Sequence, residues 1–123
     1  MTPMDAGRLV ATYGDAWNEA DESARRKLLE EAWADDGVYR DPTALVEGRD
    51  ALLAHIAGMR EAMAGASIES TSGVEEHHGW FRFAWAMKDA TGAVAMEGFD
   101  VGRIGPDGRI ADIVGFFGPF PAA

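Results

Sequence analysis

Residues 80–88, which read Trp80-Phe81-Arg82-Phe83-Ala84-Trp85-Ala86-Met87-Lys88, alternate large apolar side chains with smaller or polar ones. A period of two residues is typical of a β-strand with one buried face. The apolar side chains at positions 81, 83, 85 and 87 share a face, and we expect that face to cover the core. The stretch therefore predicts a strand in a sheet that is apolar on one side.

Three more strands are predicted around this one, at residues 67–77, 94–104 and 109–117. Ala90-Thr91-Gly92 and the Gly-Pro-Asp-Gly run at 105–108 are strong turn signals between the last three strands. Connections this short join antiparallel neighbours. The second half of the chain is thus expected to form an antiparallel sheet of hairpins.

Helical spacing dominates the first half of the chain. A first helix is predicted to start at Thr2, with Pro3 at its first position and Asp5 in its first turn. A second helix, capped by Asp21 or Ser23, is predicted to run to about Trp33.

The second helix is predicted to expose its charged residues, Arg25 among them. Residues 34–37 are expected to end it, and residues 38–42 to form a short extended piece. A third helix follows Gly48 and ends near Gly65.

Helices followed by strands predict an α+β fold. We expect one domain over residues 1–123, a cone-shaped half-barrel with three N-terminal helices packed on a curved antiparallel (mixed) sheet. The concave face of such a cone is an apolar floor on which a small, mostly apolar molecule can bind.

Composition excludes several other functions. The 21 acidic and 11 basic residues give a formal net charge of −10, which argues against nucleic acid and anionic lipid as partners. There is no cysteine, so thiol chemistry and thiolate metal sites are excluded. Neither a signal peptide nor a membrane-spanning run is visible, and a cytoplasmic protein is expected.

Asp100 is the most informative polar residue, because aspartate is rare in the middle of a strand. Gly98 and Gly102, two residues away on either side, would leave room for its carboxyl. Alternation allows two orientations: outward into solvent, with Phe99 and Val101 inward, or inward. If Asp100 faces the core, desolvation should raise its pKa and could keep it neutral as a proton donor.

Asp41 and Tyr13 are also open to two interpretations. Asp41 precedes a proline, so it either forms a turn or projects into the cone as a general base. Tyr13 is on the apolar face of the first helix, as a core residue or as a hydrogen-bond donor to a ligand.

The histidines do not predict a metal site. His77 and His78 are adjacent near a turn, and alternation would direct only one of them inward. His55 is placed at the rim of the pocket or in the core, rather than in catalysis. We expect no metal and no cofactor.

Four stretches, taken in order, resemble the nuclear-transport-factor-2-like superfamily, and within it the SnoaL-like polyketide cyclases and the ketosteroid isomerases. They are residues 13–21, residues 33–42, residues 48–52, and the C-terminal run from Asp100 through 108–110 to 116–118. The resemblance covers nearly the whole chain.

This resemblance implies a fold and a set of roles. The family's helix-one tyrosine falls on Tyr13, its catalytic base on Asp41 and its strand aspartic acid on Asp100, which would turn inward. In the isomerases the base moves a proton while the tyrosine and the neutral acid stabilise an enolate. The predicted pocket is completed by Trp17, His55, Met59, Phe81, Phe83, Trp85, Met87, Ile113 and Phe117.

Several departures from the isomerase pattern matter. Trp17 and Trp85 would narrow the pocket, and Arg40 beside Asp41 would hold that carboxyl ionised and make it a weak base. Epoxide hydrolysis, organised by Arg82 or Arg103, is a further alternative.

Two classes of function follow. One is an acid–base catalyst acting on a small, mostly apolar carbonyl compound by isomerisation, cyclisation or dehydration. The other is a non-catalytic module that binds a small ligand or forms dimers. The resemblance also implies a homodimer formed through the outer face of the sheet.

Overall fold

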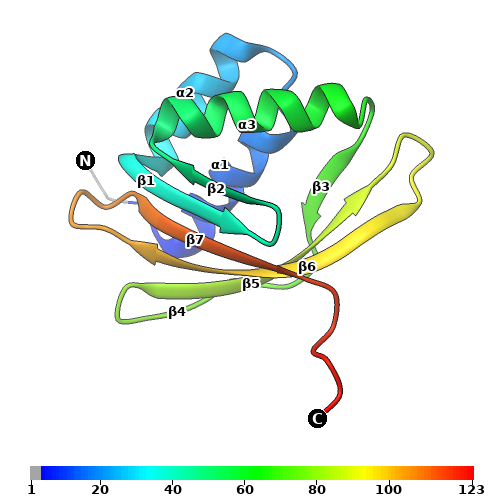
Figure 1. Ribbon diagram of the computed structural model, residues 1–123. Helices are drawn as coiled ribbons and strands as arrows, with labels where there is room; N and C mark the ends of the chain where they lie inside the picture. The colour runs from blue at the N-terminus through cyan, green and yellow to red at the C-terminus, as the bar shows by residue number, and fades with distance from the viewer. Residues whose placement is uncertain (1–3) are drawn as a thin grey trace.

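A computed structural model describes residues 4–123, and in this part of the chain three helices lie against one face of a curved, open sheet (Figure 1). The helices are α1 (Ala6–Asn18), α2 (Glu22–Ala32) and α3 (Arg49–Ala62). The strands are β1 (Trp33–Asp41), β2 (Ala44–Glu47), β3 (Ser67–Ser70), β4 (Glu75–His77), β5 (Trp80–Lys88), β6 (Val94–Ile104) and β7 (Ile110–Phe117). The predicted α+β half-barrel is confirmed.

Helix α1 begins later than predicted. Asp5 is its N-cap, and Oδ1 of Asp5 accepts a hydrogen bond of 2.8 Å from the backbone N–H of Arg8. A short acidic side chain in this position satisfies a backbone donor that the first helical turn leaves free. The predicted start at Thr2 is therefore wrong, while Thr2 and Pro3 themselves lie outside the described residues.

Helix α2 has the predicted cap, Asp21, whose Oδ2 accepts from the backbone N–H of Ala24 at 2.8 Å. The prediction that Arg25 is solvated was wrong, because this side chain is buried. Its guanidinium donates hydrogen bonds to the carbonyl oxygens of Glu19 and Ala20 and so stabilises the loop between α1 and α2. The sequence shows that Arg25 is charged, but it does not show that loop carbonyl oxygens will accept hydrogen bonds from the buried guanidinium.

The end of α2 near Trp33 is as predicted, but strand β1 starts at Trp33, so the extended piece expected at residues 38–42 begins earlier and includes residues 34–37. The pairing of β1 with β7 shifts register between Trp33 and Val38, where the turn-like residues form a bulge inside the strand. Gly37 is needed there, because a Cβ would come within 2.5 Å of Nε1 of Trp33. A hairpin from β1 to β2, which was not predicted, follows Asp41.

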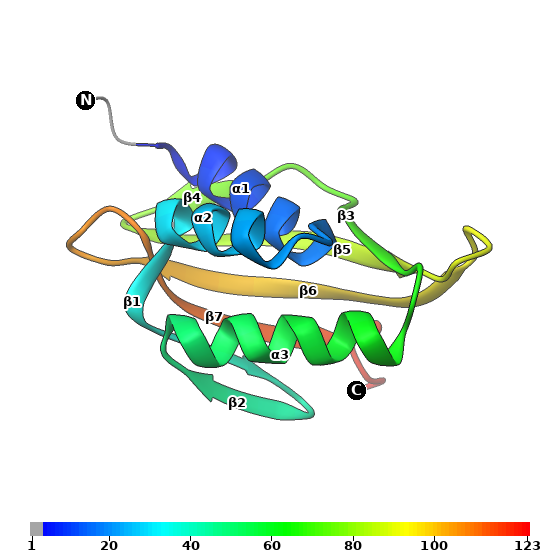
Figure 2. The same ribbon diagram turned by 90° about the horizontal axis from the view of Figure 1, so that it is seen from above.

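The sheet has the order β2-β1-β7-β6-β5-β3, and β4 also pairs with β5. Strands β1 and β7 are parallel, and the other pairs are antiparallel. For β5–β6 and β6–β7 the turn signals predicted this. The single strand expected at 67–77 is in fact two short strands. Seen from above, α1, α2 and α3 lie across the concave face (Figure 2). No helix in the described part of the chain has the length and apolar run that a membrane crossing requires.

Glycines on the concave face make space for large neighbours. In the register of β5, β6 and β7, Phe81 faces Gly102 and Trp85 faces Gly98, and each aromatic ring occupies the volume a side chain on the glycine would need. Gly115 faces Asp100 in the same way, since a Cβ there would lie 2.8 Å from Oδ1 of Asp100. Gly115, rather than the Gly98 and Gly102 noted in the sequence, thus leaves room for the inward carboxyl of Asp100.

Candidate functional site

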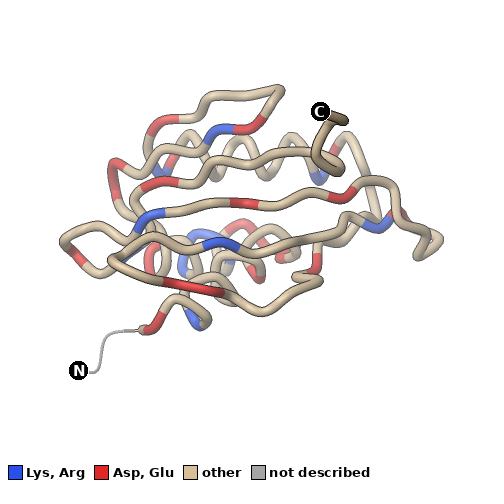
Figure 3. The backbone as a smooth tube through the Cα atoms, turned by 90° about the horizontal axis from the view of Figure 1, so that it is seen from below, with Lys and Arg blue, Asp and Glu red and all other residues tan. Residues whose placement is uncertain are grey.

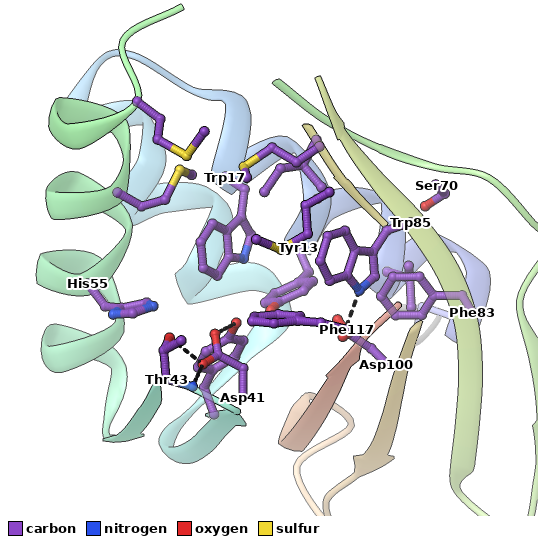
Figure 4. A pocket seen from close by; sticks show the side chains of 18 of the residues that line it. Tyr13, Trp17, Asp41, Thr43, His55, Ser70, Phe83, Trp85, Asp100 and Phe117 are labelled. Carbon is purple, nitrogen blue, oxygen red and sulfur yellow. Dashed lines mark hydrogen bonds between the residues drawn. The ribbon is translucent and has the colours of Figure 1, made fainter. Parts of the chain in front are cut away.

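A cavity of about 470 Å³ lies between the helices and the concave face of the sheet. This volume is in the range of pockets that bind small molecules. It is lined mostly by apolar and aromatic side chains, with a few polar ones. Figure 4 labels polar and aromatic residues of this lining. The lining residues are Val10, Tyr13, Gly14, Trp17, Tyr39, Asp41, Thr43, Ala54, His55, Gly58, Met59, Met63, Ile68, Ser70, Phe83, Trp85, Met87, Met96, Asp100 and Phe117.

Three polar residues named from the sequence, Tyr13, Asp41 and Asp100, line this one cavity although they come from α1, β1 and β6. Seven of the other predicted pocket residues line it as well: Trp17, His55, Met59, Phe83, Trp85, Met87 and Phe117. Trp17 and Trp85 are part of the wall, and the cavity remains open beside them.

Phe81 and Ile113, which were predicted to lie on the pocket floor, do not line the cavity. Both are register partners of Gly102, Phe81 on β5 and Ile113 on β7, and both lie in the hydrophobic core. The predicted face was right. Alternation identifies a face, however, and does not say how far along the strand the cavity extends.

Asp100 is 6% exposed, and its Oδ1 accepts a hydrogen bond of 2.9 Å from Nε1 of Trp85. Burial raises the pKa of Asp100 to about 7, the Trp85 hydrogen bond acts against this, and the nearby Asp41 carboxylate adds to it. A carboxyl with this pKa is present in both protonation states near neutral pH. It can therefore donate a proton or accept one.

Asp41 has different neighbours. Its Oδ2 accepts a hydrogen bond of 2.6 Å from the Tyr39 hydroxyl, and its Oδ1 accepts from the backbone N–H and the hydroxyl of Thr43 at 2.7 and 2.8 Å. Partial burial acts to raise the pKa of Asp41, but these hydrogen bonds outweigh it and hold the pKa below its usual value. Asp41 is consequently ionised at neutral pH.

The sequence suggested that Arg40 holds Asp41 ionised, but this prediction is wrong. Arg40 reaches Asp112 instead, with Nη1 and Oδ1 at 3.3 Å, and Asp112 also pairs with Arg103 at 2.7 Å. Arg82 pairs with Glu75 at 2.7 Å, and none of these arginines lines the cavity. Figure 3 views the sheet from the side away from the helices, where basic and acidic residues lie on neighbouring strands.

The prediction that Arg82 or Arg103 organises epoxide hydrolysis is wrong for the same reason. Alternation along β5 and β6 directs both side chains away from the concave face. A cation on the other side of the sheet cannot orient a reacting group in the cavity.

Tyr13 is buried and stacks on Trp33, with ring centroids 5.5 Å apart. Burial, and after it the charge of Asp100, raises the pKa of Tyr13 well above its usual value, so the hydroxyl keeps its proton. Among residues 4–123 no acceptor takes that proton in a hydrogen bond, which leaves it available to a ligand.

Tyr39, Thr43 and Met96 are site residues that the sequence reasoning missed. Tyr39 had a usable signal, because residues 39 and 41 of one strand share a face. Burial, then the hydrogen bond to Asp41, raises the pKa of Tyr39, so it stays a donor. Thr43 bonds to Asp41 only because of the turn at Pro42, which spacing does not reveal.

His55 points from α3 into the cavity (Figure 4). Its ring centroid is 5.8 Å from that of Trp17 and 5.5 Å from that of Tyr39. Among residues 4–123, no three His, Asp or Glu side chains lie together as ligands of a metal ion would.

Residues 10–113 match the family model of the SnoaL-like domain. No curated protein matches the chain. Among solved structures, a SnoaL-like family protein from Agrobacterium tumefaciens strain C58, provisionally named an isomerase, is 32% identical. That alignment covers 91% of this chain and 96% of the other, with a TM-score of 0.86.

Two more distant structures share the fold. An NTF2-like protein of unknown function from Exiguobacterium sp. 255-15 is 21% identical over 91% of this chain and 99% of its own, with a TM-score of 0.73. A protein from Sinorhizobium meliloti, provisionally named a polyketide cyclase, is 22% identical over 94% and 99%, with a TM-score of 0.71.

Proposed function

The chain belongs to the SnoaL-like domain family, and from that premise we propose that it is an acid–base catalyst acting on a small, mostly apolar carbonyl compound. The observation that carries the proposal is one apolar cavity lined by two carboxyls whose pKa values are moved in opposite directions, beside a tyrosine that keeps its proton. Groups arranged in this way favour proton transfer next to a carbonyl.

In the proposed reaction, Asp41 removes a proton from the carbon next to the carbonyl. The electron pair of the broken C–H bond forms the enolate C=C bond, and the negative charge moves to oxygen. The hydroxyl of Tyr13 and the protonated form of Asp100 donate hydrogen bonds to that oxygen. Asp41 then returns its proton to the enolate. Isomerisation, cyclisation and dehydration can all begin with this step.

Asp41 suits the role of base because it is ionised and still has a free lone pair. Thr43 makes two hydrogen bonds to Oδ1, whereas Oδ2 receives only one, from Tyr39. A carboxylate oxygen accepts two hydrogen bonds, so Oδ2 can take a proton from a bound substrate. Asp100 suits the role of donor because its raised pKa keeps much of it protonated near neutral pH.

Deuterium exchange tests the proposal without knowledge of the natural substrate. A small ketone is incubated with the protein in heavy water, and the loss of protons next to the carbonyl is followed by NMR. We expect Asp41→Asn to slow the catalysed exchange by about 10²–10⁴-fold, and Tyr13→Phe to slow it by about 10²-fold.

Asp36→Asn, which neutralises an exposed carboxyl on the same strand as Asp41, is the matched control and should exchange at the wild-type rate. Ketone binding without exchange would contradict the proposal. That result would favour the non-catalytic module that binds a small ligand in the same cavity.

We also propose that the outer face of the sheet forms a homodimer. Phe99 and Phe116 are register partners on that face, their rings stack at 5.4 Å, and Phe116 is 49% exposed. Exposed aromatic side chains of this kind are typical of subunit interfaces. A mass in solution near twice 13.2 kDa is expected, and a monomer would overturn this expectation.

A further inference from the structure

Four of the six methionines of the chain line the cavity. Met59 is in α3 and Met63, one turn later, is the C-cap residue of this helix. Met87 and Met96 are register partners on β5 and β6, and Ile68 of β3 pairs with Met87 on its other side. We call the part of the cavity lined by these five residues the methionine end.

The methionine end is separated from the carboxyls. Met96 precedes Asp100 by four residues on β6, which corresponds to about 13 Å along a strand. On the opposite wall, Met63 at the C-cap of α3 follows His55 by eight residues, or about 12 Å along the helix axis. In Figure 4 the sulfur atoms lie on the side of the cavity away from the carboxyl oxygens of Asp41 and Asp100.

The two ends differ in chemistry as well as position. All titratable residues that line the cavity, Tyr13, Tyr39, Asp41, His55 and Asp100, lie outside the methionine end, and no lysine or arginine lines the cavity at all. Thioether side chains are apolar, unbranched and polarizable, so they adjust to groups of variable shape. Such walls favour a flexible hydrocarbon group and disfavour a charged one.

We propose that the methionine end is a specificity site for a flexible, uncharged hydrocarbon arm on the carbonyl substrate. This inference rests on the proposed function, because it places the carbonyl beside Tyr13 and Asp100. With the reacting group there, the arm passes the Trp85 ring, which covers Gly98, and extends toward Met96. The substrate class is therefore an uncharged ketone or ester with an apolar chain that extends up to about 13 Å from the reacting carbon.

A series of straight-chain methyl ketones from butanone to undecanone tests the site. Binding is read from the quenching of tryptophan fluorescence, since Trp17 and Trp85 line the cavity. Each added methylene that enters the methionine end should lower Kd about fourfold, and the decrease should stop once that part of the cavity is full. A Kd that does not depend on chain length would overturn the proposal.

Substitutions on α3 locate the effect. Met59→Glu places a carboxylate in the methionine end, so it should abolish the gain from chain length and weaken the binding of undecanone far more than that of butanone. Ala57→Glu adds the same charge to an exposed position of the same helix and should leave the whole series unchanged. Equal weakening of butanone and undecanone by Met59→Glu would contradict the site.

Met96→Ala provides a second test if Met59→Glu does not fold. The smaller side chain enlarges the methionine end, so the decrease in Kd should continue to longer ketones than in the wild type. If Kd stops decreasing at the same chain length as in the wild type, the proposal is overturned. Chain-length dependence without deuterium exchange would support the methionine end as a binding site and contradict the catalytic function. Exchange without chain-length dependence would do the opposite.

Discussion

Asp41, at the turn between β1 and β2, and Asp100, in the middle of β6, line the same cavity among opposite kinds of neighbours. Three hydrogen bonds from Tyr39 and Thr43 stabilise the charge of Asp41, whereas Asp100 receives one, from Trp85, and is nearly fully buried. One carboxyl therefore has a lowered pKa and the other a raised one. Hydrogen-bond donors thus outweigh partial burial at Asp41, while burial dominates at Asp100.

The largest expected effect is on stability, and Asp100→Asn measures it. The pKa of Asp100 is about 7 in the folded protein and about 4 in the unfolded chain, so between these values the unfolded state binds fewer protons. Folding stability contributed by this group therefore falls as pH rises from about 4 to about 7. Near pH 8 the neutral Asn variant should be roughly 4 kcal/mol more stable than the wild type.

Urea unfolding of both proteins near pH 8 and below pH 4 checks this prediction. The difference should disappear at the lower pH, where Asp100 is protonated in the folded and unfolded states. A difference of the same size at both pH values would contradict the raised pKa. Asp36→Asn, at an exposed position, should show little change at either pH.

The next effect concerns the single hydrogen bond to Asp100. Trp85→Phe keeps an aromatic ring and removes the N–H donor, so it should raise the pKa of Asp100 by about one to two pH units. NMR titration of the side-chain carboxyl measures this directly. Trp80→Phe, on the exposed face of the same strand, is the matched control. An unchanged pKa in Trp85→Phe would mean that the indole does not stabilise the carboxylate.

Tyr39→Phe should have the smallest effect, in the opposite pH range. It removes one of three hydrogen bonds to Asp41, so the pKa of Asp41 should rise toward its usual value. Because solvent screens this partly exposed carboxylate, the variant should be about 0.5–1 kcal/mol less stable at neutral pH. The loss should fade as pH falls through the pKa of Asp41, since protonation removes the charge that the hydroxyl stabilises. Thermal unfolding over a pH series tests the trend, and a loss that persists in acid would refute it.

The sequence predicted the sheet better than it predicted the chemistry of the two carboxyls. Alternation at residues 80–88 identified the buried face, but the space at Gly98 and Gly102 is taken by the rings of Trp85 and Phe81. Periodicity could not choose the orientation of Asp100, because Phe99 and Val101 were equally good candidates for the core. That choice depends on the register with Gly115 of β7, which is a property of the assembled sheet.

The surroundings of Asp41 were harder to predict. Asp35, Asp36 and Gly37 have the composition of a turn, yet they lie within β1 because pairing with β7 holds the strand together around a bulge. The sequence also offered Arg40 as the group that keeps Asp41 ionised. Tyr39 and the turn residue Thr43 have that role instead, because Arg40 is directed to Asp112.

The pH dependence of catalysed deuterium exchange tests the central claim, that Asp41 is the base and protonated Asp100 is a donor. After subtraction of the uncatalysed rate, exchange should be fastest below pH 7 and should decline as pH rises through about 7, because Asp100 loses the proton that it donates. Asp100→Asn, which keeps an N–H donor and has no titrating group, should flatten this decline. A rate that instead rises through about pH 7 would make Asp100 the base and contradict the assignment of both carboxyls.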